Sequence, residues 1–172
     1  MRRSLTLFAT LFLLWVISGQ INHYLAGLHV SLFFGGLCVV FSALRLNRNE
    51  GLLTSFAAGL LFDATSPLWF GCHALLFATA HMIVFRVRSR VPRDETMIPI
   101  VIGLLANLGI YLGVSFVALQ GLPPGVNPWP RLLADLLFSQ IALVLAGPWF
   151  LSLQERCLEI VGAGLHLDQP GV

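Results

Sequence analysis

The chain has 172 residues, of which 57% are hydrophobic and only 10% are charged, and its mean hydropathy is +0.85. Soluble domains carry about 25% charged residues, so this composition excludes a soluble protein and predicts an all-α integral membrane protein. The net charge is +2, and all ten Lys and Arg residues are arginines. They lie in the links between apolar runs or outside the first and last run, which does not indicate nucleic-acid binding.

Six apolar segments follow one another along the chain. They cover residues 4–21, 25–44, 52–62, 68–85, 97–119 and 132–153. Five are long enough to cross a bilayer at about 1.5 Å per residue. The third is short, and even when extended over residues 50–66 it reaches only about 25 Å. Length alone therefore leaves five or six crossings open.

The arginines decide between five and six crossings, because short cytoplasmic links collect basic residues. With six crossings, nine arginines share one side and only Arg131 lies opposite. With five, the basic cluster of Arg86, Arg88, Arg90 and Arg93 falls outside. We therefore predict a six-transmembrane-helix bundle with a short third helix and both termini in the cytoplasm. Acidic lipid or a partner is a further explanation for the basic cluster.

One polytopic membrane domain is expected over residues 1–161, followed by a flexible cytoplasmic tail over 162–172. The first apolar segment follows Arg2 and Arg3, so a signal peptide is an alternative to the retained anchor helix that we favour. Asn22 and His23 are expected to form a tight hairpin between the first two helices. The proline-rich link over residues 120–131 disfavours helix.

Small residues recur every fourth position in the third segment, at Gly51, Ser55 and Gly59. On a helix this spacing forms a smooth ridge that lets another helix approach closely. Two interpretations stay open. The ridge packs inside the bundle, or it docks the transmembrane helix of a partner.

Asp63 ends the third segment and is the acid of most interest, because acids within membranes are costly and usually functional. One interpretation is that it caps the start of the fourth helix together with Thr65 and Ser66. The other is that it binds a ligand, an ion or a partner.

Polar residues also occur at helical spacing in the last two segments. Asn107, Tyr111 and Ser115 form an i, i+4 stripe, for which we expect hydrogen bonds between helices. Arg131 and Asp135 have the same spacing and are expected to form an ion pair. The Gly147-Pro148 pair is expected to kink the sixth helix.

Motifs of catalysis are not found in the sequence: it has no G-x-S-x-G, Walker loop or H-E-x-x-H pattern. His73 and His81 lie about 12 Å apart along one helix, which is too far to hold one metal ion. We therefore expect neither an enzyme nor a metal site nor a cofactor.

The stretch from Gly59 to Gly71 resembles the MreD family of rod shape-determining proteins. That family shows a G-L-x-x-D pattern, a break with Ser and Pro, a Leu-Gly pair and a further apolar helix. The matching residues here are Gly59, Asp63, Ser66, Pro67 and Gly71. Phe70-Gly71 stands where the family has Leu-Gly.

The resemblance implies a non-enzymatic scaffold of the bacterial elongation complex in the cytoplasmic (inner) membrane. Proteins of this family work with MreC, which is the expected direct partner. MreB, RodA and a class B penicillin-binding protein belong to the same complex, which controls cell shape through peptidoglycan synthesis. The resemblance also implies a membrane fold similar to the substrate-binding subunits of energy-coupling-factor transporters.

The alternative function is that of such a substrate-binding subunit in a vitamin transporter. It requires polar groups that converge on a ligand from the outer side. The sequence offers few there, and they are Asn22, His23, Asp63, Thr65, Ser66 and Asn127.

Overall fold

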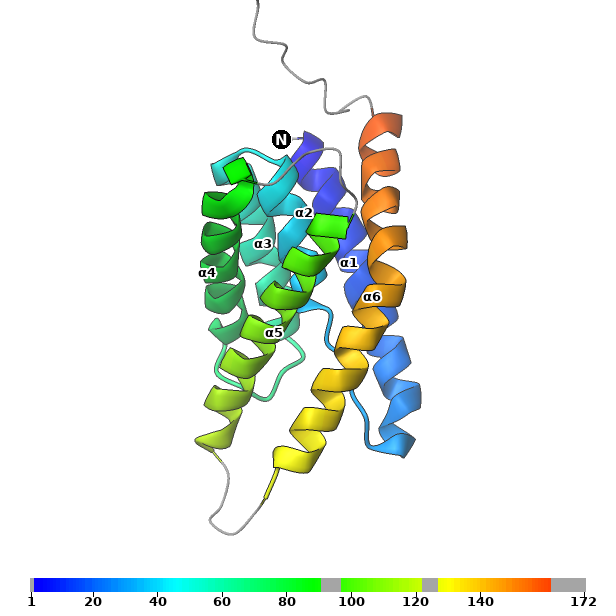
Figure 1. Ribbon diagram of the computed structural model, residues 1–172, viewed down its shortest axis with the longest axis vertical. Helices are drawn as coiled ribbons and strands as arrows, with labels where there is room; N and C mark the ends of the chain where they lie inside the picture. The colour runs from blue at the N-terminus through cyan, green and yellow to red at the C-terminus, as the bar shows by residue number, and fades with distance from the viewer. Residues whose placement is uncertain (1, 91–96, 122–126, 162–172) are drawn as a thin grey trace, which may run out of the picture.

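The computed structural model describes residues 2–90, 97–121 and 127–161. Over these ranges every regular element is a helix, as predicted. The α-helices are α1 (Arg2–Leu25), α2 (Gly35–Arg45), α3 (Arg48–Asp63), α4 (Cys72–Val87), α5 (Met97–Leu119) and α6 (Trp129–Ile160). Two short 3-10 helices, Ala26–Leu28 and Arg88–Arg90, follow α1 and α4. The α-helices run up and down along one axis, so the start of α1, the α2–α3 link and the end of α6 lie at one end (Figure 1).

Three of the described segments are long and apolar enough to cross a membrane: Ser4–Leu28, Met97–Leu119 and Trp129–Ile160. Gly35–Arg45 and Cys72–Val87 are apolar but shorter. The 16 residues of α3 rise about 24 Å, close to the length expected for it. The structure thus supports a membrane protein, while a six-crossing arrangement stays a prediction.

The second apolar segment departs most from the sequence-based expectation. A helix was expected over residues 25–44, but α2 begins only at Gly35. The predicted hairpin at Asn22 and His23 is wrong, because α1 continues to Leu25. His29 then adopts a left-handed φ of 56°, and the chain returns without helical structure to Phe34. Aromatic and β-branched residues there have low helix propensity. Side chains of other helices accept hydrogen bonds from the backbone amides, as described below.

The central element of the bundle is α2, which packs against α3, α4, α5 and α6. Its residues from Gly35 to Ala43 are all buried. A Cβ atom on Gly36 would lie 2.7 Å from Asn107 Cβ, so glycine lets α2 approach α5 closely. The main core combines apolar residues of all six α-helices with Phe34: Leu11, Leu37, Cys38, Val39, Ala58, Phe77, Ile110, Leu143 and Phe150.

The longest helix, α6, contains Pro148 and continues beyond it to Ile160. Figure 1 shows α6 changing direction along its length, consistent with the kink expected from Gly147-Pro148. Its outward side is apolar and exposed at Leu137, Leu145 and Trp149. A helix of this length with such a face is suited to contact lipid or another membrane helix.

Candidate functional site: two polar clusters at one end of the bundle

The small-residue ridge of α3 packs inside the bundle. A Cβ atom on Gly59 would meet Ala74 of α4, at 2.7 Å from its backbone nitrogen. On Gly51 it would meet His81 Cε1 at 2.5 Å. Ser55 Oγ lies 2.7 Å from Ser42 Oγ of α2 and 3.2 Å from His81 Nδ1. Of the two interpretations of the ridge, the contacts support internal packing, and the ridge is not an exposed surface.

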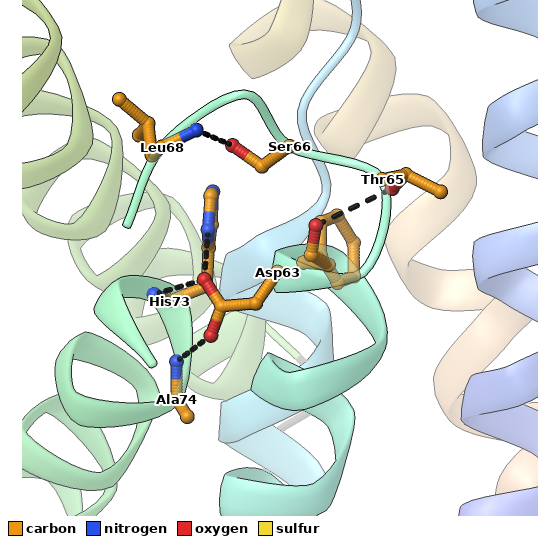
Figure 2. Close-up of polar contacts among 7 residues, drawn as sticks. Asp63, Thr65, Ser66, Leu68, His73 and Ala74 are labelled. Atoms are coloured by element: carbon orange, nitrogen blue, oxygen red, sulfur yellow. Dashed lines mark hydrogen bonds and ion pairs between the residues drawn. The ribbon is translucent and has the colours of Figure 1, made fainter. Parts of the chain in front are cut away.

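Asp63, the last residue of α3, binds the start of α4 through both carboxylate oxygens (Figure 2). Oδ1 accepts a hydrogen bond from the backbone N–H of His73 and lies 2.9 Å from His73 Nδ1. Oδ2 accepts one from the backbone N–H of Ala74 at 3.1 Å. The Asp63 side chain is almost fully buried, with 4% of the residue exposed. We call Gly59, Asp63, His73 and Ala74 the Asp63 cluster.

This arrangement follows from what the end of a helix requires. The first amides of α4 have no carbonyl partner within their own helix, and they carry the positive end of the helix dipole. The residue before α4 is Gly71, which has a φ of 98° and provides no side-chain cap. Asp63 therefore caps α4 from the preceding helix, while Gly59 brings the two helices close enough for the carboxylate to reach.

Thr65 and Ser66 do not take part in this cap, contrary to the expectation. Thr65 Oγ1 donates to the carbonyl of Phe62 at 3.3 Å, and Ser66 Oγ accepts from the N–H of Leu68 at 3.3 Å (Figure 2). Both hydroxyls thus bond to groups close to them in the sequence. They hold the loop between α3 and α4, and the cap is left to Asp63.

A second polar cluster holds the non-helical segment that precedes α2. Asp135 of α6 accepts hydrogen bonds from the backbone N–H of Ser31 at 2.9 Å and from its hydroxyl at 3.2 Å. Asn22 of α1 brackets Leu32, accepting from its N–H at 2.7 Å and donating to its carbonyl at 2.8 Å. Ser139 Oγ accepts from the N–H of Phe33 at 2.9 Å. We call Asn22, Asp135 and Ser139 the Asp135 cluster.

The Asp135 cluster satisfies three consecutive backbone amides that a helix would have paired internally. Within hydrocarbon, an unpaired backbone group costs several kcal/mol, so irregular backbone occurs only where protein groups satisfy it. Asn107 continues the pattern from α5, since its Oδ1 accepts from the N–H of Gly36 at 3.0 Å. The start of α2, like that of α4, is thus capped by a side chain of another helix.

An aromatic group connects the two clusters. The ring of Phe33 lies 5.7 Å from Phe62, 6.2 Å from His73 and 6.0 Å from Tyr111, measured between centroids. Phe33 belongs to the segment held by the Asp135 cluster, whereas His73 belongs to the Asp63 cluster. The geometry joins the two clusters into one region at the same end of the bundle.

Several pairings read from the sequence are confirmed. Tyr111 donates to the carbonyl of Leu132, so the polar stripe of α5 does bond to α6. Arg131 lies 3.9 Å from Asp135, as its spacing predicted. The spacing did not predict the main partner of Asp135, which is the backbone of residue 31. A polar stripe at positions 131, 135 and 139 of α6 was the available signal.

The predicted basic cluster lies at the opposite end from these two polar clusters. Arg86 is exposed on the last turn of α4. Arg88 donates to the carbonyl of Leu46 at 2.6 Å and lies over the ring of Phe85. The side chain of Arg90 and all of Arg93 lie outside the described part of the structure. At the same end, Arg45 of α2 pairs with Glu155 of α6 at 2.8 Å.

The comparison with known families places the chain among membrane proteins of cell shape. A family model described as rod shape-determining protein MreD matches residues 1–123. The matched part includes the whole Asp63 cluster and ends before Asp135 and Ser139 of α6. Searches of curated proteins and of solved structures give no match.

Proposed function

Because the chain belongs to the family of the rod shape-determining protein MreD, we propose that it is a non-enzymatic membrane scaffold of the bacterial elongation complex. In this proposal the chain binds MreC directly. It helps couple MreB filaments to peptidoglycan synthesis by RodA and its class B penicillin-binding protein. The family match is the observation that carries the proposal, because it covers more than half of the chain and includes α1 to α5.

The use of the polar side chains supports a scaffold. Asp63, Asn22 and Asp135 are committed to the backbone of this chain. Asp63 fixes the start of α4, while Asn22 and Asp135 fix the non-helical segment before α2, and we expect these bonds to make the bundle rigid. A rigid bundle presents constant outer faces to its partners, and this is the requirement for a scaffold.

The proposal needs a docking surface other than the α3 ridge, which is buried. Apolar side chains are exposed on α1 at Phe12, Leu13 and Ile17 and on α6 at Leu137 and Leu145. In lipid such faces associate through packing and hydrogen bonds rather than through the hydrophobic effect. The membrane helix of MreC would therefore be sought against the long helices first.

We propose further that all six helices cross the cytoplasmic membrane, as one domain over residues 1–161, with both termini in the cytoplasm. The end of α2, the start of α3 and the end of α4 share one end of the bundle (Figure 1), and five of the ten arginines lie there or in the 3-10 helix that follows α4: Arg45, Arg48, Arg86, Arg88 and Arg90. Basic links favour the cytoplasmic side. The polar clusters then lie toward the outer side.

The alternative of a transporter's substrate-binding subunit finds less support. It requires outward polar groups that are available to a ligand. Asn22 and Asp63 instead bond to the backbone of the chain, and Thr65 and Ser66 bond within their own loop. A ligand would have to displace these bonds.

Co-purification tests the proposed function. The tagged full chain is purified in detergent from its own host, and the recovered proteins are identified by mass spectrometry. We expect MreC in near-stoichiometric amount, with the polymerase pair in part of the preparation. Purified MreC should then bind the purified chain directly. Recovery of ATPase subunits with a coupling protein, and not of MreC, would replace the scaffold by the transporter alternative.

A further inference from the structure

An apolar groove of about 350 Å³ lies between α4 and α5, on the outside of the bundle. Its α4 wall includes Thr79, Ile83 and Val87, and its α5 wall includes Ala106 and Gly109. The two small residues of α5 produce the hollow, and a Cβ atom added to Gly109 would meet nothing within 4 Å. The groove is therefore open space, not a tight contact between helices.

The length of the groove corresponds to one leaflet of a bilayer. On α4 it extends from Leu76 to Val87, a rise of about 16 Å along the helix. Half of the hydrocarbon core of a bilayer is about 15 Å thick. An acyl chain that enters at Val87 would reach the other end of the groove near the middle of the membrane.

The end of the groove at Val87 is basic. Arg86 lies seven residues after Thr79 and three after Ile83, so helical spacing places it on the face of α4 that borders the groove. Its side chain is exposed. Arg88 follows two residues later, at the start of the 3-10 helix, and its guanidinium binds the carbonyl of Leu46. A phosphate above an acyl chain in the groove would therefore meet Arg86 first.

We propose that this groove is a binding site for an anionic phospholipid. One acyl chain lies between α4 and α5, and the phosphate pairs with Arg86. Arginine binds phosphate through charge-assisted hydrogen bonds, and basic residues beside membrane helices attract anionic headgroups. This lipid site goes beyond a scaffold role, because the bound lipid becomes part of the α4–α5 surface.

Native mass spectrometry of the purified full chain tests the site. The delipidated protein in detergent is titrated with phosphatidylglycerol or with phosphatidylcholine, and the lipids retained per chain are counted. We expect one phosphatidylglycerol per chain at concentrations where phosphatidylcholine is largely lost. Equal retention of the two lipids would overturn the anionic preference. A dimer of the chain without bound lipid would assign the groove to a second copy.

Two matched pairs of variants separate the acyl-chain contact from the charge. Gly109→Leu fills the groove and should lower retention of both lipids, whereas Gly19→Leu, which adds a side chain to open space on α1, should not. Arg86→Gln should weaken the binding of phosphatidylglycerol alone. We expect a decrease of about fivefold, because the substitution removes one surface charge. Arg156→Gln, on the exposed surface of α6, is its control.

The outcomes are decisive in both directions. Equal losses in Gly109→Leu and Gly19→Leu would show that the groove does not hold the lipid. Equal losses in Arg86→Gln and Arg156→Gln would reduce the effect to general attraction by surface charge. The exposed Arg86→Gln keeps the test valid even if Gly109→Leu does not fold. MreC is not needed in this assay, so its result is independent of the co-purification experiment.

Discussion

The Asp63 and Asp135 clusters use the same chemistry in different ways. In both, a buried carboxylate accepts hydrogen bonds from backbone amides. Asp63 joins two helices that follow one another, and its partners are 10 and 11 residues away. Asp135 binds a residue 104 positions away and holds a segment that is not helical. Asp63 caps the start of a helix, whereas Asp135 binds a backbone amide that a helix would have paired internally.

The difference teaches how a short chain accommodates polar backbone in a membrane bundle. At the Asp63 cluster only the free amides at the start of α4 need a partner. At the Asp135 cluster every amide from residue 31 to residue 33 needs one, and three side chains from α1 and α6 provide them. The first cluster depends on one residue, whereas the second distributes its bonds over several.

The largest expected effect comes from Gly59→Leu in the Asp63 cluster. The added side chain would collide with the backbone of Ala74, so α3 and α4 must separate and the cap is lost. We expect a loss of about 3 kcal/mol in the free energy of unfolding, together with loss of rod shape in complementation. Thermal unfolding in detergent measures the first effect.

Gly19→Leu is the matched control for this substitution, because a Cβ atom there meets nothing within 4 Å. It should leave stability and cell shape near those of the unchanged chain. Normal stability of Gly59→Leu would show that the close contact between α3 and α4 is not required.

Asp63→Ala should follow, with a loss of about 2.5 kcal/mol. The substitution leaves the amides of His73 and Ala74 without a partner, and each buried unsatisfied donor costs about 1–3 kcal/mol. Hydrogen exchange should accelerate at these two amides and not at residues 31–33. Asp63→Asn keeps an acceptor oxygen and should recover part of the stability. Full restoration of rod shape by Asp63→Ala would show that the cap is not required for function.

Asp135→Ala should cost less, about 1.5 kcal/mol, since Asn22 and Ser139 continue to hold the segment. Its signature is faster hydrogen exchange at Ser31, with His73 and Ala74 unaffected. An effect larger than that of Asp63→Ala would reverse the order of the two clusters. It would show that the distributed bonds act as one unit.

Asn22→Ala should cost about 1 kcal/mol, because it removes two neutral hydrogen bonds to one residue. Hydrogen exchange should accelerate at Leu32 specifically. Combining it with Asp135→Ala sharpens the comparison. A double variant that loses clearly more than the sum of the two single losses would demonstrate coupling within the Asp135 cluster.

The smallest effect is expected for Arg45→Gln at the opposite end of the bundle. The ion pair with Glu155 is partly exposed to solvent, and such pairs contribute about 0.5 kcal/mol. The loss of stability should shrink further as salt is added. A loss comparable to that of Asp63→Ala would show that the basic end is as important for folding as the two polar clusters.

Much of the helical architecture was predictable because apolar runs dominate the sequence. The fifth segment, residues 97–119, coincides with α5, since nothing polar interrupts the run until Asn107. The third segment was recognised from its small residues, and a capping role was one of the two interpretations of Asp63, because acid, loop and helix lie within a dozen residues. These features are local, and local spacing is what a sequence displays directly.

The second segment was mispredicted because its composition resembles that of a membrane helix. Val30, Leu32 and Phe33 are as apolar as residues of α2. Hydropathy does not distinguish a non-helical segment from a helix. The partners of its amides lie on α1 and α6. Only the folded bundle shows that Asn22 and Ser139 face this segment.

The sequence by itself determined that this protein is a helical membrane protein of the MreD family and that Asp63 is close to the start of the fourth helix. Composition, arginine placement and a motif of about a dozen residues are sufficient for these two conclusions. Each of these features can be read directly along the sequence, without knowledge of which helices are neighbours. Only the tertiary structure decided that the α3 ridge is buried and that residues 31–33 are not helical. Those outcomes depend on which helices become neighbours, and contacts across a hundred residues are set by packing of the whole bundle.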